Sequence, residues 1–387
     1  APHVHRRMRR HIAPVVHPGF PRPRTIVPHG LLPFAPHEPH VAVNRIDARP
    51  FIAGLRLIRR DRQKRISNGR LDIGGDAYWD HYATRDAYQS ARGIDVNVRG
   101  NVTIGNGGQI RLYGGTTNGN AGGIGVDENA ALSGRFDVRG DITIATNGWL
   151  HAYSHPVEGG SYRITCRKAD IALGGGITAN DRGWSGLGTT SSTIREELGL
   201  TGSGREGYGP GKGRAAGNGG GYGGMGGGSN GGLTYGNWRR PALPGSGAGA
   251  ANSTTAASGA GGGLIWLDAR KEVDLKGTIS ADGQKGGGTY GSGGSGGGIY
   301  LKTPELKVSE GSVISAQGGG CNAADGARGG GGRIAIWANN YAEVAAATNT
   351  GVLAISVLPG QTGNKSYGKD GTVFMRSYPG GILVFVR

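Results

Sequence analysis

Hydrophobic residues in the second half of the chain alternate with other residues over short stretches, and the same stretch recurs. Ile265, Ile299 and Ile334 open three such stretches at spacings of 34 and 35 residues. Alternation with a period of two predicts β-strands that place one set of side chains on one face. A second short strand and an Ile-Ser-Ala step follow in the units that begin at Ile265 and Ile299. The pattern therefore predicts stacked repeats of short strands.

Earlier copies of the unit lie in the first half of the chain. Residues 97–104 read NVRGNVTI and residues 137–144 read DVRGDITI, so every apolar position is kept at a displacement of 40 residues. A third form begins at Tyr162 and places Cys166 level with Ala269. Apolar side chains that stack from unit to unit form an interior that no single unit could bury. We therefore expect an all-β chain folded as a parallel β-helix, or β-solenoid.

Glycine runs lie between the strands, and glycine supplies 81 of the 387 residues. The runs include residues 219–232, 286–298 and 318–332 and recur at the same point of the repeat. Glycine loses the most backbone entropy on ordering, so close packing of backbone on backbone is the usual reason for retaining it. We predict polyglycine-type loops, extended with three residues per turn, that lie side by side and share backbone hydrogen bonds. Solvated flexible loops are the alternative.

Composition divides the chain into five parts. We expect an extended basic arm rich in Pro, His and Arg (1–65), a first β-solenoid part (66–183), a Gly-rich insertion (184–260), a second β-solenoid part (261–345) and a C-terminal cap or strand (346–387).

The arm holds most of the net charge. It carries 14 Lys and Arg against three acidic residues, in a chain whose net charge is +16. Such a polar segment buries too little apolar surface to fold alone, so we expect a neighbouring copy of the protein to hold it. A flexible basic tail is the alternative. The predicted assembly contacts are the apolar residues of the arm and of the terminal strand: Ile26, Val27, Leu31, Leu32, Phe34, Phe51, Leu383 and Phe385.

Signals for cofactors and metals are weak. Residues 202–207 match the dinucleotide pattern GxGxxG, but chance alone produces such a match in a chain this rich in glycine. Residues 211–213 lack the glycine and the Ser or Thr of a phosphate loop. His3, His5 and His11, or His37 and His40, could ligate a divalent ion, but no Cys or carboxylate completes a closed site. We expect no cofactor and no metal.

Two charged groups are candidates for glycan chemistry, because carbohydrate-active β-helices use clustered carboxylates on one solvent face. One group comprises Asp268, Arg270, Lys271, Glu272 and Asp274. The other comprises Asp72, Asp76, Asp80 and His81. We interpret both as solvated strand edges, which leaves a polysaccharide lyase or hydrolase as the less favoured alternative.

Three features bear on location and redox state. The chain begins with Ala1 and Pro2, which fits the mature end of a secreted protein. No apolar run is long enough to cross a bilayer, so no membrane span is expected. Cys166 and Cys321 are the only cysteines, and the sequence leaves their pairing open.

The chain resembles the glycine-rich β-helical surface and adhesin-like proteins of environmental bacteria in the motifs GGGYGGMGG, GGGLIWL, GTISADG, GGSGGGIYL, VISAQGGG and GGGGRIAIW. The resemblance covers about residues 95–340 and leaves the arm outside. The short Gly motifs are also similar to those of phage tail-tip adhesins built on polyglycine sandwiches. The resemblance implies extracellular structure or adhesion and provides no catalytic residues to transfer.

We therefore expect a secreted, non-enzymatic structural protein that assembles with itself into a filament, sheath or surface layer through its arm. The alternative is a non-polymeric adhesin that binds anionic polysaccharide through the basic arm and exposed aromatic residues. Nucleic acid is not an expected partner, because the arm lacks aromatic residues interleaved with its basic ones.

Overall fold

Every residue described by the computed structural model lies in the unit Ala42–Arg387. The backbone is described for three early strands, β1 (Lys64–Ser67), β2 (Arg70–Ile73) and β3 (Tyr78–Asp80). Backbone and side chains are described for residues 96–115, 132–186, 206–215, 217–250, 258–287, 290–321, 326–362 and 367–377.

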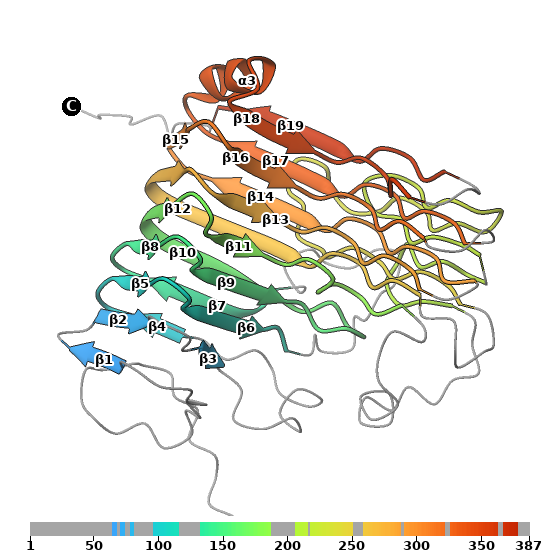
Figure 1. Ribbon diagram of the computed structural model, residues 1–387, viewed down its shortest axis with the longest axis horizontal. Coiled ribbons are helices and arrows are strands. Elements are labelled where there is room, and N and C mark those ends of the chain that lie inside the picture. Colours follow the sequence, from blue (N-terminus) through green and yellow to red (C-terminus); the bar gives the residue numbers. More distant parts are fainter. Residues whose placement is uncertain are drawn as a thin grey trace, which may run out of the picture. The chain divides into compact units, whose positions relative to one another are not determined.

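Most strands belong to a 12-stranded sheet with the order β1-β2-β5-β8-β10-β12-β14-β17-β19, in which β4 pairs with β7, β7 with β10, and β15 with β12 (Figure 1). The pairs are parallel except for β1 with β2. The remaining strands of this sheet are β4 (Val96–Val98), β5 (Val102–Ile104), β7 (Leu132–Val138), β8 (Ile142–Ile144), β10 (Ser161–Ile171), β12 (Leu264–Leu275), β14 (Gly298–Lys302), β15 (Glu305–Val308), β17 (Arg333–Trp337) and β19 (Thr372–Arg376).

A second sheet of seven parallel strands has the order β18-β16-β13-β11-β9-β6-β3. Besides β3, its strands are β6 (Gln109–Tyr113), β9 (Trp149–Tyr153), β11 (Gly176–Thr178), β13 (Thr278–Ser280), β16 (Ser312–Ser315) and β18 (Leu353–Ser356).

Tight four-residue turns join the two sheets at one edge. In four of them a residue in the left-handed region precedes a backbone hydrogen bond that closes the turn. These residues are Gly107, Asn147, Gly174 and Gly311, with φ between 58° and 87°. Glycine and asparagine adopt this region more readily than other residues do, so the repeat keeps one or the other at this position.

The alternating residues of both sheets face one another and form the core. Ile164, Leu267, Leu301 and Ile336 occupy the same register on neighbouring strands and are each fully buried. Trp266, Tyr300 and Ala335 point to the other face of the 12-stranded sheet, as the alternation predicted, and form a separate apolar cluster. The predicted alignment of Cys166 with Ala269 is confirmed by the register of β10 and β12. Cys166 and Cys321 are both buried and form no disulfide.

The prediction of a parallel β-helix, or β-solenoid, is wrong. The strands form two flat sheets, and they are accompanied by a helix, α3 (Tyr341–Asn349). The physical reason lies beyond the strand ends that are remote from the tight turns. There the chain enters glycine-rich segments and returns to the next strand, and in the part of the chain that the structure describes no third strand layer closes the coil (Figure 1). The hydrophobic repeat correctly specifies which strands pair, but it does not specify this connection.

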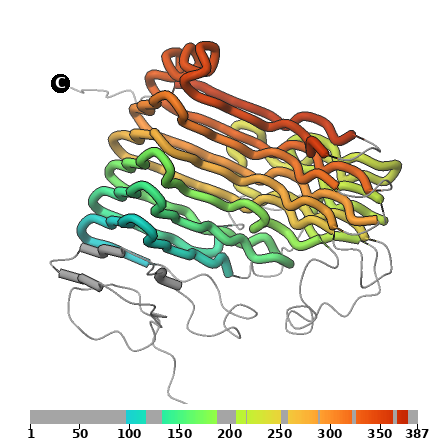
Figure 2. The backbone as a smooth tube through the Cα atoms, in the orientation of Figure 1, coloured from blue at the N-terminus to red at the C-terminus, as the bar shows by residue number. Residues whose placement is uncertain are grey.

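The glycine-rich segments form a hydrogen-bonded lattice, and their donors repeat every three residues. In residues 293–298, the first and fourth amides donate to segment 327–330, and the second and fifth donate to segment 281–284. The third and sixth donate to Ser246 and Gly263. A period of three is that of an extended helix with three residues per turn. The segments share backbone hydrogen bonds as expected, and Figure 2 shows them running beside one another.

Residues from the stretch 184–260 take part in the same lattice. The amide of Gly220 donates to Gly293, and the carbonyl of Gly220 accepts from Gly330. A Cβ atom at Gly220 would lie 2.2 Å from a backbone oxygen of Ser246. Close approach of backbone to backbone is therefore the reason why glycine is retained here.

Candidate functional site

A row of arginines crosses the outer face of the 12-stranded sheet. Arg99 and Arg139 follow β4 and β7, whose register places Val98 beside Val138. Gly140 follows Arg139, and a Cβ atom there would lie 2.6 Å from the carbonyl oxygen of Gly100. In both of these copies the chain therefore turns at a glycine and presents the preceding arginine to solvent.

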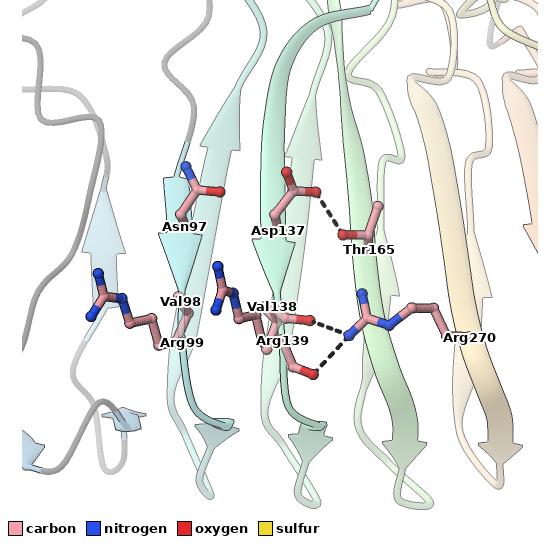
Figure 3. Close-up of a pocket in the computed structure, with 8 residues that line it drawn as sticks. All are labelled: Asn97, Val98, Arg99, Asp137, Val138, Arg139, Thr165 and Arg270. Atoms are coloured by element: carbon pink, nitrogen blue, oxygen red, sulfur yellow. Dashed lines mark hydrogen bonds between the residues drawn. The ribbon is translucent and has the colours of Figure 1, made fainter.

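Arg99 and Arg139 lie with Arg270 along a hollow of about 490 Å³ (Figure 3). The guanidinium of Arg270 donates to the carbonyls of Val138 and Arg139 at 3.1 and 2.7 Å, which holds it in place. Asn97, Asp137 and Thr165 form a second row in the hollow, in which the Thr165 hydroxyl donates to Asp137 at 2.6 Å. The lining contains three arginines against one carboxylate, so the hollow favours an anion.

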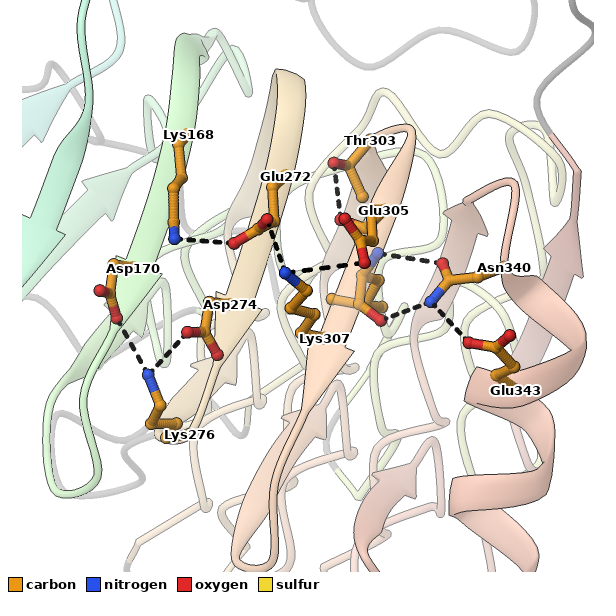
Figure 4. A network of polar contacts seen from close by, with 11 residues as sticks. Lys168, Asp170, Glu272, Asp274, Lys276, Thr303, Glu305, Lys307, Asn340 and Glu343 are labelled. Atoms are coloured by element: carbon orange, nitrogen blue, oxygen red, sulfur yellow. Dashed lines mark hydrogen bonds and ion pairs between the residues drawn. The ribbon is translucent and has the colours of Figure 1, made fainter.

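A ladder of ion pairs runs across β10, β12 and β15 of the same sheet (Figure 4). Glu272 lies between the ammonium groups of Lys168 and Lys307, at 2.7 and 2.9 Å. The two lysines hold the pKa of Glu272 at about 2, below its ordinary value of 4.5. This carboxylate is therefore ionised across the neutral range and is occupied by its partners.

The other carboxylates of this predicted group are paired as well. Asp268 accepts from Arg163 at 3.0 Å and from Lys302 at 3.3 Å. Asp274 accepts from Lys276 at 2.7 Å. Glycoside cleavage needs two carboxyl groups that are open to the substrate, whereas Asp268 and Asp274 are each occupied by cationic partners. The pairs favour the interpretation of this group as part of the sheet's structure.

The ladder ends at helix α3. The side-chain amide of Asn340, the residue before the helix, donates to the carbonyl of Leu306 and accepts from its N–H, both at 3.0 Å (Figure 4). The side chain of Asn340 thus provides the hydrogen bonds to the backbone of β15 that a neighbouring strand would otherwise provide. Val344 of α3 is buried against the core. This edge of the sheet is therefore covered.

Several predicted residues lie outside the described part of the chain. They include all eight assembly contacts, namely Ile26, Val27, Leu31, Leu32, Phe34, Phe51, Leu383 and Phe385, and also Asp76, His81 and the histidines of the arm. Asp72 and Asp80 lie in β2 and β3, for which only the backbone is described. Among residues whose side chains are described, no three His, Cys, Asp or Glu lie close enough to hold a metal ion. In the same residues, no helix is long and apolar enough to cross a membrane.

The arginine row was not predicted from the sequence, although the sequence contains a signal for it. Arg99 and Arg139 occupy the same position of the two copies NVRG and DVRG, 40 residues apart. Because only the apolar positions of the repeat were compared, the shared arginine was not interpreted. A polar residue that recurs at one position of a stacked repeat predicts a row on one face.

No protein-family model, curated protein or solved structure matches this chain.

Proposed function

We propose that the protein is a non-enzymatic extracellular structural protein that assembles with copies of itself through its N-terminal arm, residues 1–65. The extracellular location rests on the resemblance to glycine-rich surface proteins. The ion pairs of the 12-stranded sheet support the absence of glycan cleavage, because they neutralise its clustered carboxylates.

The single observation that carries self-assembly is the exposed end of an apolar column. Ile265, Ile299 and Ile334 stack in register, and each is fully buried. Val373 of β19 continues this column, yet 41% of it is exposed. An apolar column that ends in an exposed side chain is suited to a contact with another chain.

The backbone of β19 supports the same contact. Among the described residues β19 pairs only with β17, toward which the N–H of Thr372 points. Alternate amides of a strand point to opposite sides, so the N–H groups of Val373 and Met375 point away from β17. An extended segment that pairs there would gain main-chain hydrogen bonds and apolar anchors together. The arm of a second copy provides both.

Removal of residues 1–65 tests the proposal by sedimentation velocity and negative-stain electron microscopy of purified protein. The full chain should form assemblies, and the shortened chain should remain monomeric. Val373→Lys in the full chain should weaken assembly by placing a charge at the contact. As a control, replacing Arg6, Arg7, Arg9 and Arg10 by Gln changes the charge of the arm and keeps its apolar residues, so assembly should persist. Polymers of the shortened chain would refute the role of the arm.

Adhesion to anionic polysaccharide is the second candidate, and the arginine row favours it. Exposed arginines attract a polyanion through electrostatic interactions, which are screened by salt. Arg99→Gln with Arg139→Gln should reduce retention on immobilised alginate at low salt. Arg239→Gln with Arg240→Gln removes the same charge elsewhere and should not. Equal retention of the two double variants would contradict a site at this row.

A further inference from the structure

The outer face of the seven-stranded sheet presents rows of polar and aromatic side chains. Parallel pairing in register places equivalent residues of successive strands next to one another. The middle row runs across six strands and consists of Arg111, His151, Thr178, Ser280, Ser315 and Ser356. Their neighbours Ile110, Ile177, Ile279 and Ile314 point into the core and fix this orientation.

A hollow of about 600 Å³ follows this face from β6 to β16. Five strands at a spacing of about 4.8 Å give the hollow a length of about 19 Å. Its volume is within the range of small-molecule sites, and its length suits a short chain of linked units. The residues that carry the argument are Gln109, Trp149, His151, Thr178, Asp282 and Gln317.

Aromatic rings form one end of the hollow. The ring of Trp149 lies over Gly176, where a Cβ atom would be 2.7 Å from it. The absence of a side chain at position 176 therefore lets the indole lie close to the sheet. Farther along β6 and β9, outside the lining of the hollow, Tyr113 and Tyr153 stack with centroids 4.3 Å apart, and Arg182 covers the ring of Tyr153 at 4.7 Å. Trp149 is left half-buried as a platform on which a ligand ring can stack.

His151 supplies an unused polar atom beside this platform. Its Nε2 is buried and has no hydrogen-bond partner among the described residues. Burial first, and then Arg111 and Arg182, lower the pKa of His151 to about 4. A neutral imidazole has one donor and one acceptor nitrogen, which is the combination that a hydroxyl group can satisfy. A buried polar atom without a partner is costly, so a ligand that satisfies it gains affinity.

The charge of the hollow argues for an uncharged ligand. Asp282 is the only carboxylate of the lining, and the lining contains no Lys or Arg. The Asp282 carboxylate already accepts from the Ser315 hydroxyl at 2.5 Å and from the backbone N–H of Gln317 at 2.6 Å. The remaining groups, such as Gln109 and Thr178, are neutral donors and acceptors. The residues of the lining therefore offer aromatic surface and hydroxyl-compatible hydrogen bonds, and the nearby cations Arg111 and Arg182 lie outside the lining.

We propose that this face binds an uncharged oligosaccharide, with one sugar ring stacked on Trp149 and a hydroxyl bonded to His151. The chain of sugars runs across the strands, and its hydroxyls meet Thr178 and the side chain of Gln317. This site lies on the sheet opposite to the arginine row and does not depend on self-assembly. The site adds the recognition of a neutral glycan to the proposed structural function of the protein.

Affinity electrophoresis of the full chain tests the site with four neutral polysaccharides (β-glucan, xylan, mannan and galactan). Alginate serves as the anionic polysaccharide for comparison. At least one neutral polysaccharide should retard the protein equally at low and high salt, because no charge pair is involved. Trp149→Ala should weaken this binding by about three- to tenfold, the loss expected for one aromatic stacking contact. Trp238→Ala removes an indole that is 44% exposed outside the hollow, and binding should be unchanged.

His151→Leu provides a second variant that keeps the platform and removes the polar atom, and it should also bind more weakly. The melting temperature of each variant checks that it is folded. The proposal is overturned if none of the four neutral polysaccharides retards the full chain, or if alginate alone does. It is equally overturned if folded Trp149→Ala and His151→Leu bind as well as Trp238→Ala.

Discussion

A methyl group added at Gly294 tests whether the glycine lattice is a packed part of the structure. The Cβ atom of Gly294→Ala would lie 2.0 Å from the carbonyl oxygen of Ala260, where ordinary contact begins at 3.4 Å. The two segments must therefore separate by 1.4 Å, the difference between these distances. The obstacle is backbone on both sides, so a rotation of a side chain cannot relieve it.

The cost follows from the hydrogen bonds that join the two segments. Gly259 donates to Ser292 at 2.7 Å, and Gly262 donates to Ser295 at 2.9 Å. A separation of 1.4 Å lengthens both to about 4 Å, beyond hydrogen-bonding range. Each buried bond left unmade costs about 1–3 kcal/mol, so Gly294→Ala should lose about 2–6 kcal/mol of the free energy of unfolding.

Gly351→Ala is the matched control. Gly351 has no atom within 4 Å of an added Cβ, and its φ is 77°. Its substitution therefore costs only the strain of a left-handed alanine, about 1–2 kcal/mol. Urea unfolding followed by circular dichroism compares the two variants through their midpoints. Equal destabilisation of Gly294→Ala and Gly351→Ala would refute the idea that the lattice is tightly packed.

Three further predictions concern other parts of the chain. Glu272 stabilises the fold fully above pH 4.5, and this contribution is lost as the pH falls toward 2, because its pKa is lowered in the folded state. Glu272→Gln should therefore cost about 1–2 kcal/mol in urea melts at neutral pH, discounted for the partly exposed lysines, and should flatten the acid side of the stability profile. Burial raises the pKa of Cys166 to about 12, so iodoacetamide should leave this thiol unmodified in native protein and alkylate it in urea, as read by mass spectrometry. Amides of residues 293–298 should exchange with deuterium as slowly as those of neighbouring strands, and fast exchange would mean that their hydrogen bonds are not formed in solution.

The strand pairs were predictable because the hydrophobic repeat has a local cause. Ile265, Ile299 and Ile334 recur at nearly constant spacing, and equivalent residues of stacked units must meet to exclude water. Their register follows from the same repeat. The flat arrangement of the sheets was not predictable, because the apolar positions do not specify how the chain returns from one strand to the next.

Helix α3 interrupts the repeat and was not predicted. Its sequence YAEVAAATN holds four alanines and a glutamate in the first turn, which favour a helix locally. Asn340 before it would have strengthened that prediction. The predicted boundary between the second β-solenoid part (261–345) and the C-terminal cap or strand (346–387) falls inside this helix.

The candidate sites depend on register between distant segments. Glu272 meets Lys168 and Lys307 across strands, and each partner is more than 30 residues away in the chain. Trp149 and His151 lie two residues apart, so alternation places them on one face, but the hollow also needs β11, β13 and β16. The sequence alone indicates which residues of one strand share a face. It does not determine which strands lie side by side to form the hollow.

The threefold period of the hydrogen-bond donors restricts the number of residues that can be inserted into a glycine segment or deleted from it. Insertion of one residue before Gly293 would turn each following donor by a third of a turn, toward a neighbour that does not present an acceptor to it. Insertion of three residues would restore the direction of every donor. The segments can therefore lengthen or shorten in steps of three, and indels of one or two residues should be excluded from them even though they look like loops.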